Sequence, residues 1–227
     1  MNTVKRLLSL LLAAAALYAG VAQAAVVRGV GNTALVGHDL TDPEDDADPN
    51  AYVNYNAIFR SSVEPQFHNE GAFNVFDNKL GGGDNKWCCD INGWVEADFG
   101  DKRYQLTSFT VSSANDATGR DADVWKILGS NDGINYTTIF SYDHDGISPW
   151  GTSRDQVIEY SAGIDFKLPA AYSIFRYQSY SVISDGVHQL AELEFFGREP
   201  ADVPEPASLA LLGLGLLGLT AWRRKRG

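Results

Sequence analysis

The sequence has little sulfur and little histidine. Its 227 residues include two cysteines, one methionine and four histidines. The cysteines are adjacent, at Cys88 and Cys89, which excludes a scaffold of several disulfides, and no second cysteine pair or nearby histidine completes a zinc site. Neighbouring Cα atoms lie about 3.8 Å apart, below the usual disulfide range of roughly 4.4–6.8 Å. A bond between these two cysteines would therefore be strained, and two free thiols or an intermolecular bond are the alternatives.

Motifs typical of enzymes are also missing. The sequence contains no Gly-x-Ser-x-Gly nucleophile elbow and no His-x-x-x-His zinc motif. A catalytic site needs an acid–base pair, a nucleophile with its base, or an open metal site. The many carboxylates leave a pair of glycosidase type open, but no second domain is present to carry the chemistry. We therefore expect a protein that is not an enzyme.

Positive charge is scarce between the two ends of the chain. Six of the 18 Lys and Arg residues lie in the terminal segments 1–24 and 223–226, whereas all 29 Asp and Glu residues lie between these segments. The 12 remaining basic residues against 29 acidic ones give residues 25–222 a net charge of −17. A surface this acidic repels nucleic acid and anionic lipid and favours cations, so we expect no nucleic-acid partner.

The N-terminal segment is typical of a secretory signal peptide. Lys5 and Arg6 precede an apolar run over 7–19, and Ala22-Gln23-Ala24 supplies small residues before a cut at Ala25. This layout predicts that the protein is exported and that residues 1–24 are removed. The remaining 25–202 is long enough for one ordinary domain with a sizeable core.

The C-terminal segment 203–227 resembles the PEP-CTERM sorting signal of Gram-negative bacteria. Pro204-Glu205-Pro206 is followed by an uncharged run over 207–222 and by the basic residues 223–226. The run of about 16 residues is slightly below the usual spanning length of roughly 17–25, and the basic tail would stay cytoplasmic. The resemblance implies a transmembrane helix, transient anchoring in the inner membrane, cleavage by an exosortase, and release to the cell surface or an exopolysaccharide matrix.

Short alternating segments dominate the region between the ends. Trp94–Phe99 alternates apolar and polar residues, as in a half-buried strand. Asp132-Gly133 separates two β-prone runs, which predicts a hairpin. We find no convincing amphipathic helix in this region, and turns recur every 8–12 residues. The sequence predicts an all-β domain, a β-sandwich or jelly roll of about eight antiparallel strands. The further expected strands are 26–27, 34–36, 73–76, 104–112, 124–130, 136–142, 157–160, 166–168, 172–182 and 190–196.

A loop rich in glycine and oxygen follows the expected strand 73–76. Its residues 77–90 read DNKLGGGDNKWCCD. Glycine, Asp and Asn tolerate positive φ, so the chain can turn tightly here. Such a loop can wrap Ca²⁺, which takes six to eight oxygen ligands, or it can be a surface turn before a buried Trp87. The acidic stretch 39–49 lacks the glycine and distal glutamate of an EF-hand, so we interpret it as a solvated loop.

Three segments resemble the discoidin, or coagulation-factor C-type, domain of the galactose-binding-like superfamily. They are the apolar strand and turn 124–133 with Tyr136-Thr137-Thr138, the closing run Leu190–Gly197, and the Asp-containing turn that ends at Trp87. The resemblance spans residues 73–197 in family order. It implies a β-sandwich that serves as a binding scaffold.

The resemblance also implies one structural Ca²⁺ between the Asp turn and the closing strand. Asp77 and Glu192 would supply carboxylates, and Asp84 and Asn85 would supply oxygens just before Trp87. Backbone carbonyls near residues 75 and 191 would complete the ligands. The three glycines 81–83 are extra to the family's pattern and put the part played by Asp84 and Asn85 in question.

Ligands of the family bind at variable loops at one end of the sandwich. The candidates here are His144, Trp150 and Arg154, since a sugar site needs an aromatic face and a few polar groups. The alternative for Trp150 is that it only packs its loop. The expected function is an exported, non-catalytic module that binds extracellular polysaccharide or glycan. The alternative is a structural matrix or adhesion protein whose partner is another protein.

Overall fold

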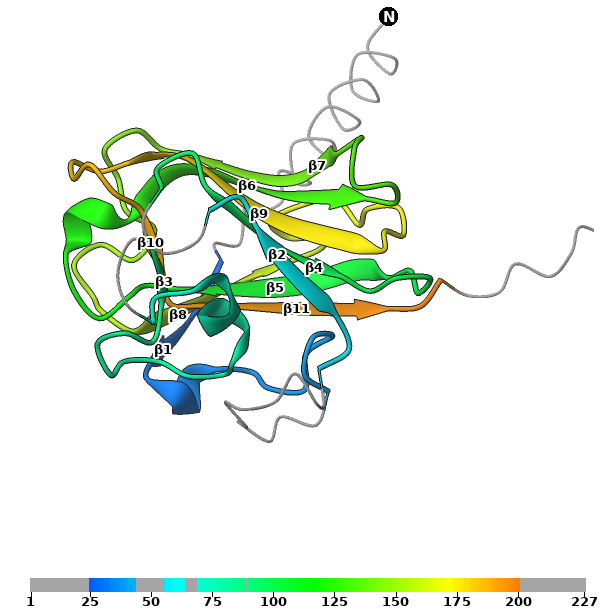
Figure 1. Ribbon diagram of the computed structural model, residues 1–227, viewed down its shortest axis with the longest axis horizontal. Helices are drawn as coiled ribbons and strands as arrows, with labels where there is room; N and C mark the ends of the chain where they lie inside the picture. Colours follow the sequence, from blue (N-terminus) through cyan, green and yellow to red (C-terminus); the bar gives the residue numbers. More distant parts are fainter. Residues whose placement is uncertain (1–24, 44–54, 64–68, 89, 201–227) are drawn as a thin grey trace, which may run out of the picture.

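The computed structural model describes residues 25–43, 55–63, 69–88 and 90–200 (Figure 1). The expected signal peptide and sorting signal lie outside these residues. Within them the chain forms eleven strands and three short 3₁₀ helices, η1 (Asn32–Ala34), η2 (Ala72–Phe76) and η3 (Thr118–Arg120). None of the described helices has the length and apolar character needed to cross a membrane.

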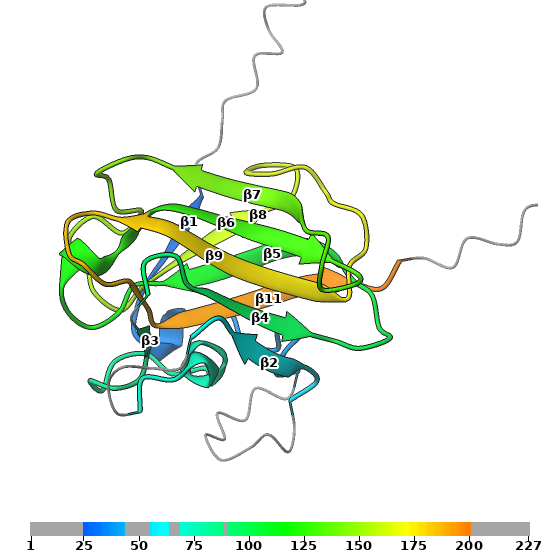
Figure 2. The same ribbon diagram turned by 45° about the horizontal axis from the view of Figure 1, so that its top comes forward.

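Two antiparallel sheets form the body of the fold. The four-stranded sheet has the order β1-β8-β5-β11, and the five-stranded sheet has the order β2-β4-β9-β6-β7 (Figure 2). The first sheet consists of β1 (Val26–Val30), β8 (Gln156–Ser161), β5 (Gln105–Ser112) and β11 (Glu192–Arg198). The second consists of β2 (Ile58–Ser61), β4 (Trp94–Asp98), β9 (Ile174–Val182), β6 (Ala122–Ser130) and β7 (Thr137–Asp143). Two short strands, β3 (Trp87–Cys88) and β10 (Gln189–Leu190), pair at one end.

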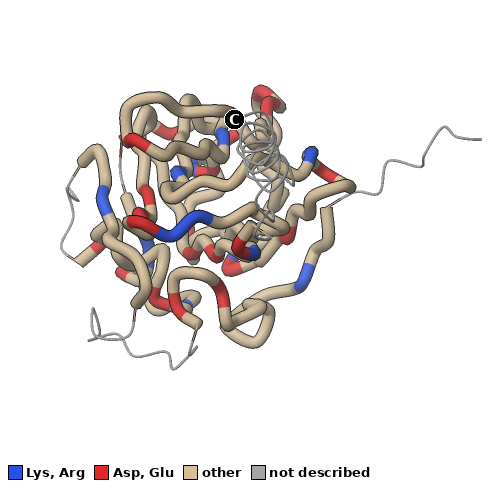
Figure 3. Tube along the Cα trace, turned by 90° about the vertical axis from the view of Figure 1, so that its right-hand side faces the viewer, with Lys and Arg blue, Asp and Glu red and all other residues tan. Residues whose placement is uncertain are grey.

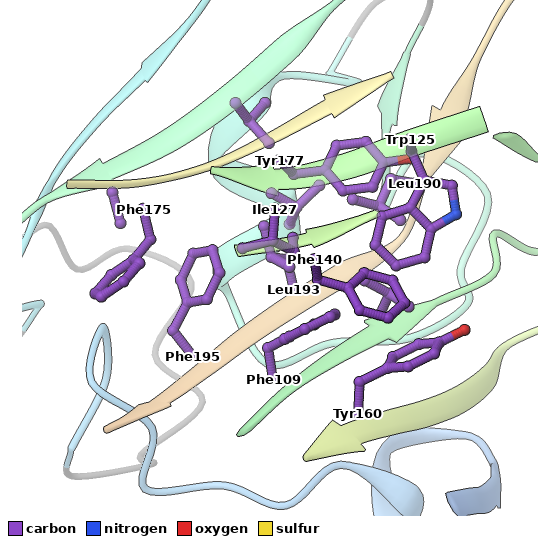
Figure 4. Packing of buried hydrophobic residues seen from close by; sticks show 14 of the residues in the cluster. Phe109, Trp125, Ile127, Phe140, Tyr160, Phe175, Tyr177, Leu190, Leu193 and Phe195 are labelled. Carbon is purple, nitrogen blue, oxygen red and sulfur yellow. The ribbon is translucent and has the colours of Figure 1, made fainter. Parts of the chain in front are cut away.

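The core lies between the two sheets and is strongly aromatic (Figure 4). Phe109 of β5 stacks on Tyr160 of β8 with ring centroids 5.2 Å apart, and Trp125 of β6 stacks on Tyr177 of β9 at 5.4 Å. Each such side chain contributes roughly 1.5–3 kcal/mol through burial. The expected all-β sandwich is confirmed, and Trp87 is fully buried in this core, as expected.

The predicted hairpin is also present. β6 pairs with β7, and Gly133 in the turn between them has φ 67°, a conformation that glycine adopts without strain. Asp132 accepts the backbone N–H groups of Ile134 and Asn135 in the same turn. The Asp-Gly pair therefore specifies this turn through both side-chain hydrogen bonding and backbone freedom.

Three expected strands are wrong. Residues 73–76 lie in the 3₁₀ helix η2. Ala34 ends η1, and residues 35 and 36 follow it outside any strand. Residues 166–168 form only an isolated bridge from Phe166 to Ala162. The η2 segment is held by Asn74, whose side-chain amide donates to the carbonyls of residues 69, 84 and 86. A short apolar run does not distinguish a strand from a single helical turn, and this tertiary contact decides between them.

The described start of the acidic stretch 39–49 is not solvated, which corrects that interpretation. Asp39 and Asp42 are buried. The Asp39 carboxylate accepts the backbone N–H groups of Thr41, Asp42 and, from β11, Phe195. This carboxylate thus fastens the N-terminal loop to the closing strand by satisfying backbone donors that would otherwise be buried without partners.

Candidate functional site

Two buried carboxylates meet where η2 approaches β11. Asp77 directly follows η2 and Glu192 begins β11. The charge of Asp77 acts on Glu192, so these residues lie close together although they are far apart in sequence. Asp77 is 5% exposed and Glu192 is fully buried. Burial raises the pKa of Glu192 well above its usual range, and the charge of Asp77 raises it further. Burial likewise raises the pKa of Asp77 to about 6.

Neither carboxylate oxygen of Glu192 has a hydrogen-bond partner among the described residues. The backbone N–H of Asn78 faces this carboxylate and lowers its pKa, but less strongly than burial raises it. Leaving such a group unsatisfied costs roughly 1–3 kcal/mol, and more when it is charged. A divalent cation between Asp77 and Glu192 would give the buried Glu192 oxygens a partner and would offset the repulsion between the two carboxylates. This pair therefore fits the expected Ca²⁺.

The structure does not bring the other two expected metal ligands to Glu192. Asp84 is exposed, and the carboxyl whose pKa it raises is Glu70. Asn85 is partly buried, and no hydrogen bond of its side chain is found among the described residues. Across the described part of the chain no three His, Cys, Asp or Glu side chains group as metal ligands. A cation at Asp77 and Glu192 would therefore rely on carbonyl and water oxygens for the remaining positions.

Sequence reasoning missed the acids that border this pair. Glu194 lies two residues after Glu192 on the same face of β11, and Thr110 and the backbone N–H groups of Val36 and Gly37 donate to its carboxylate. Asp39 likewise accepts hydrogen bonds from its own loop and from the backbone N–H of Phe195 in β11. Glu194 and Asp39 each have several donors, whereas Glu192 has only the backbone N–H of Asn78 facing it. Of these three acids, Glu192 is therefore the one that calls for an additional ligand. The Asp39-x-Thr41 spacing is typical of an Asx turn, and it could have predicted that the Asp39 carboxylate accepts hydrogen bonds within its loop.

The three residues expected to bind a ligand differ in exposure and in their contacts. Trp150 is 3% exposed in the core, and its indole N–H donates to the Val111 carbonyl at 3.3 Å. Arg154 makes two hydrogen bonds to buried Asp121, of 2.8 and 2.6 Å. His144 is exposed, with its ring centroid 4.5 Å from that of Tyr142. In this conformation Trp150 offers no face to a sugar, which favours its packing role.

A groove of about 670 Å³ lies instead on the outer face of the five-stranded sheet. Trp94, Glu96 and Asp98 line it, because side chains alternate along β4 and the intervening Val95 and Ala97 point into the core. The lining comes from β2, β4, β9 and the turns at one end of the sheet. It consists of Arg60, Trp94, Glu96, Asp98, Gly100, Asp101, Asn131, Asp132, Gly133, Ser173, Ile174 and Arg176.

Trp94 and Arg176 form one wall of the groove, and Tyr136 stacks behind them outside the lining. The Arg176 guanidinium lies 3.7 Å from the ring centroid of Trp94 and 3.9 Å from that of Tyr136. Buried Glu96 accepts hydrogen bonds from Arg176 at 2.7 and 2.9 Å and from the Tyr136 hydroxyl at 2.8 Å. Burial raises the pKa of Tyr136, so its hydroxyl stays protonated and continues to donate. The guanidinium thus fixes both rings through cation–π contacts and ion pairing.

Charged side chains line the rest of the groove. Arg60 ion-pairs with Asp98 at 2.7 Å, and its side chain is 47% exposed. Asp101 and Asp132 lie at the end of the groove, and neither forms an ion pair with any described residue. The side-chain and backbone N–H groups of Asn135 lower the pKa of Asp132, so this carboxylate stays ionised. The groove therefore offers hydrogen-bond donors and acceptors beside an aromatic wall.

The cysteines and the sorting residues complete the predicted features. Cys88 is buried and disulfide-bonded, and the only other cysteine of the chain is the adjacent Cys89, which lies outside the described residues. Pro204, Glu205 and Pro206 also lie outside them. Residues 202–226 match the family of the PEP-CTERM protein-sorting motif, which confirms that resemblance.

Solved structures resemble the fold at low sequence identity. The fucolectin from striped bass (Morone saxatilis) serum superimposes with a TM-score of 0.50 at 15% identity, over 63% of this chain and 47% of that chain. CpGH89CBM32-5 from Clostridium perfringens, in complex with GalNAc-β-1,3-galactose, gives 0.49 at 17% identity, over 63% and 96%. A family 32 carbohydrate-binding module from Streptococcus pneumoniae EndoD gives 0.49 at 9% identity, over 63% and 96%. No curated protein matches the sequence. The likeness to the fucolectin shows a shared β-sandwich fold.

Proposed function

We propose that this chain is an exported, non-catalytic module that binds polysaccharide or glycan in the groove on its five-stranded sheet. The groove itself is the observation that carries the proposal. Sugar rings present apolar faces that pack on aromatic rings and hydroxyls that both donate and accept hydrogen bonds. Trp94 supplies the aromatic surface, Arg60 supplies donors, and Asp98 and Asp101 supply acceptors.

The arrangement of the charged groups supports binding rather than catalysis. Glu96 is held by Arg176, and Asp98 is held by Arg60. Guanidinium groups therefore occupy oxygens of both acids. A glycosidase of the usual kind needs two carboxyl groups that are free to act on the glycosidic bond, whereas these two are engaged by arginines.

The role proposed for Ca²⁺ is structural. The ion would join the end of η2 to the start of β11 through Asp77 and Glu192, with backbone carbonyls and water as further ligands. An ion bound only by the folded state stabilises that state. The groove lies elsewhere, on the outer face of the other sheet, so the ion would support the fold without contacting the glycan.

The proposed location follows from the two ends. A signal peptide over 1–24 would export the chain, and the motif at 202–226 would direct it to an exosortase at the inner membrane. Cleavage would release the domain to the cell surface or matrix, where extracellular polysaccharide is the available ligand. The net charge of −17 on residues 25–222 supports the absence of a nucleic-acid partner.

Affinity electrophoresis tests this function directly. The purified exported protein is run through gels that contain galactomannan, xyloglucan, dextran or alginate, with an inert protein of similar size as reference. We expect at least one polysaccharide to slow the protein. If none does, and the protein instead associates with itself or with another protein in calcium, the alternative of a matrix or adhesion protein replaces the proposal.

A further inference from the structure

The groove runs along strands instead of closing into a pocket. Its lining follows β4 from Trp94 to Asp98 and continues to Asp101 in the next turn. At about 3.3 Å per residue, the strand portion alone spans about 13 Å. This run is longer than one six-membered sugar ring, whose bonds are each about 1.5 Å. The groove therefore has room for several consecutive sugar units.

The wall of the groove is rigid before any ligand arrives. Arg176 is held between Trp94 and Tyr136 and bonded to Glu96, which is itself 3% exposed. These four side chains come from β4, β9 and the turn before β7, and each fixes the next. Binding to such a surface loses little side-chain entropy, which improves affinity for a flexible chain.

The open part of the groove supplies paired donors and acceptors. The hydrogen bond of Arg60 to Asp98 uses only Nη1, and Nε and Nη2 have no partner among the described residues. A guanidinium beside a carboxylate can donate to one sugar hydroxyl and accept from its neighbour. Because such a pair forms hydrogen bonds with adjacent hydroxyls of one sugar, it can bind sugar units within a polysaccharide as well as the unit at its end.

The charge of the groove argues against binding of anionic polysaccharides. Two guanidinium groups face four carboxylates along the lining, namely Arg60 and Arg176 against Glu96, Asp98, Asp101 and Asp132. The groove thus has a net negative charge, and so does the whole of 25–222. A polysaccharide built of uronic acids would be repelled at low ionic strength.

From these observations we propose that the groove binds the interior of an uncharged polysaccharide, with several consecutive sugar units lying along β4 and β9. This inference rests on the glycan-binding function proposed above and specifies its ligand class and binding mode. The chain ends of the polymer are not needed for recognition. Trp94 provides the stacking surface, and Arg60 with Asp101 fixes hydroxyls.

The test uses the uncharged polysaccharide that slows the exported protein most in the gels described above. Oligosaccharides of one to eight units from that polymer compete for binding, in wild type and in Trp94→Ala, Arg60→Gln and Asp101→Asn. The matched controls are Arg103→Gln, an exposed arginine outside the groove, and Lys167→Gln, which lines a second groove of about 380 Å³ beside β7. Thermal melting checks that each variant is folded.

We expect the affinity to rise at least tenfold between one unit and six, and to be unchanged when both ends of the hexamer are blocked. Arg60→Gln and Trp94→Ala should each weaken binding at least fivefold, while both controls bind like wild type.

The inference is overturned if the monosaccharide competes as well as the hexamer, if alginate binds equally well at low salt, or if only Lys167→Gln weakens binding. In the first two cases glycan binding in this groove still stands, and in the third the glycan binds beside β7 instead. A protein that no polysaccharide slows removes both proposals. Since Arg60 is exposed, its variant keeps the test decisive if Trp94→Ala does not fold.

Discussion

Glu192 is the residue whose surroundings are least satisfied. Both of its oxygens are buried without a hydrogen-bond partner in the described structure, and Asp77, Glu194 and Asp39 all raise its pKa. A carboxylate so placed destabilises the fold unless it is protonated or bound to a cation. The two neighbours with donors show that the fold satisfies buried acids elsewhere. We therefore assign the strongest effect of added Ca²⁺ to this residue.

The first prediction concerns removal of this cation. Ca²⁺ at a hundredfold excess over its Kd should stabilise the wild type by about 2.7 kcal/mol, which raises the melting temperature by roughly 5–10 °C for a domain of this size. Asp77→Asn and Glu192→Gln should lose most of that rise. In chelator, Glu192→Gln should melt above the wild type, because it removes a buried like charge. Calorimetry with and without calcium measures both effects.

An exposed acid provides the control for the calcium prediction. Asp90→Asn removes a carboxylate that lies at the surface, so its response to calcium should match the wild type. The calcium assignment fails if the wild type melts at the same temperature in chelator and in calcium. It also fails if Glu192→Gln keeps the full response.

His188 predicts a dependence of stability on pH. It is fully buried between Trp87 and Tyr177, with Nε2 3.0 Å from the Tyr177 hydroxyl, and burial lowers its pKa to about 3. The unfolded state takes up a proton near pH 6.5 whereas the folded state resists it until about pH 3, so unfolding binds protons in this window. The contribution of His188 is complete above pH 6.5 and is lost as the pH falls.

The difference between wild type and His188→Gln isolates this effect from the buried acids. Between pH 6.5 and 3 the free energy of unfolding of the wild type should fall relative to the variant, by up to about 1.4 kcal/mol per pH unit. Urea unfolding at a series of pH values measures it. If the difference in the free energy of unfolding between wild type and variant does not change with pH, His188 takes up its proton equally in the folded and unfolded states.

Among the strands and loops, the sequence predicted best where the local pattern agreed with burial. The alternation over Trp94–Phe99 and the Asp132-Gly133 turn correspond to β4 and to the β6–β7 hairpin. The strand expected at 73–76 was wrong because a distant contact through Asn74 stabilises a 3₁₀ turn. Periodicity records which face is buried but not which loop a side chain will reach.

The groove could be predicted only in part. The pattern of β4 already placed Trp94, Glu96 and Asp98 on one face, away from the core. The pattern could not show that β2 brings Arg60 and β9 brings Arg176 to that face, because this depends on strand order and register. In the structure Arg60 pairs across from Glu96, which pairs across from Arg176. The interpretation of Trp150 as a binding residue had the same weakness, since composition does not reveal burial.

The loop between β7 and β8 is predicted to depend on Arg154. The guanidinium makes two hydrogen bonds to Asp121, which is fully buried before β6. Arg154→Ala leaves that carboxylate without this partner and should destabilise the fold by roughly 2–3 kcal/mol, near the low end for buried ion pairs because Arg154 is partly exposed. Urea unfolding measures the loss. Arg154→Lys keeps the charge but loses the paired guanidinium hydrogen bonds, so its stability should lie between those of the wild type and Arg154→Ala. Wild-type stability in Arg154→Ala would show that the contact is not structural.

At the scale of the molecule, acidic positions are spread along the described chain and outnumber basic ones (Figure 3). The sorting motif starts at residue 202, four residues after β11 ends at Arg198. Only a short segment therefore separates the β-sandwich from the sorting motif. This separation agrees with a module that is anchored first and released later, as we propose.

Release makes a prediction about mass. The C-terminal segment should be cut near Pro204-Glu205-Pro206, and the N-terminal segment should be removed before Ala25. Intact-mass analysis of the extracellular protein should show a chain that starts at Ala25 and lacks the basic tail 223–226. Extracellular protein that ends at Gly227 would contradict processing at the sorting motif.

The most direct test of the central claim is an NMR titration of the tryptophan indole N–H signals with the polysaccharide that slows the protein most. Trp87, Trp125 and Trp150 are buried, whereas Trp94 is partly exposed and lines the groove. We predict that the polysaccharide shifts one indole signal, and that this signal is absent from Trp94→Phe. The account is contradicted if the signal that shifts belongs to Trp150, or if no indole signal shifts at saturation.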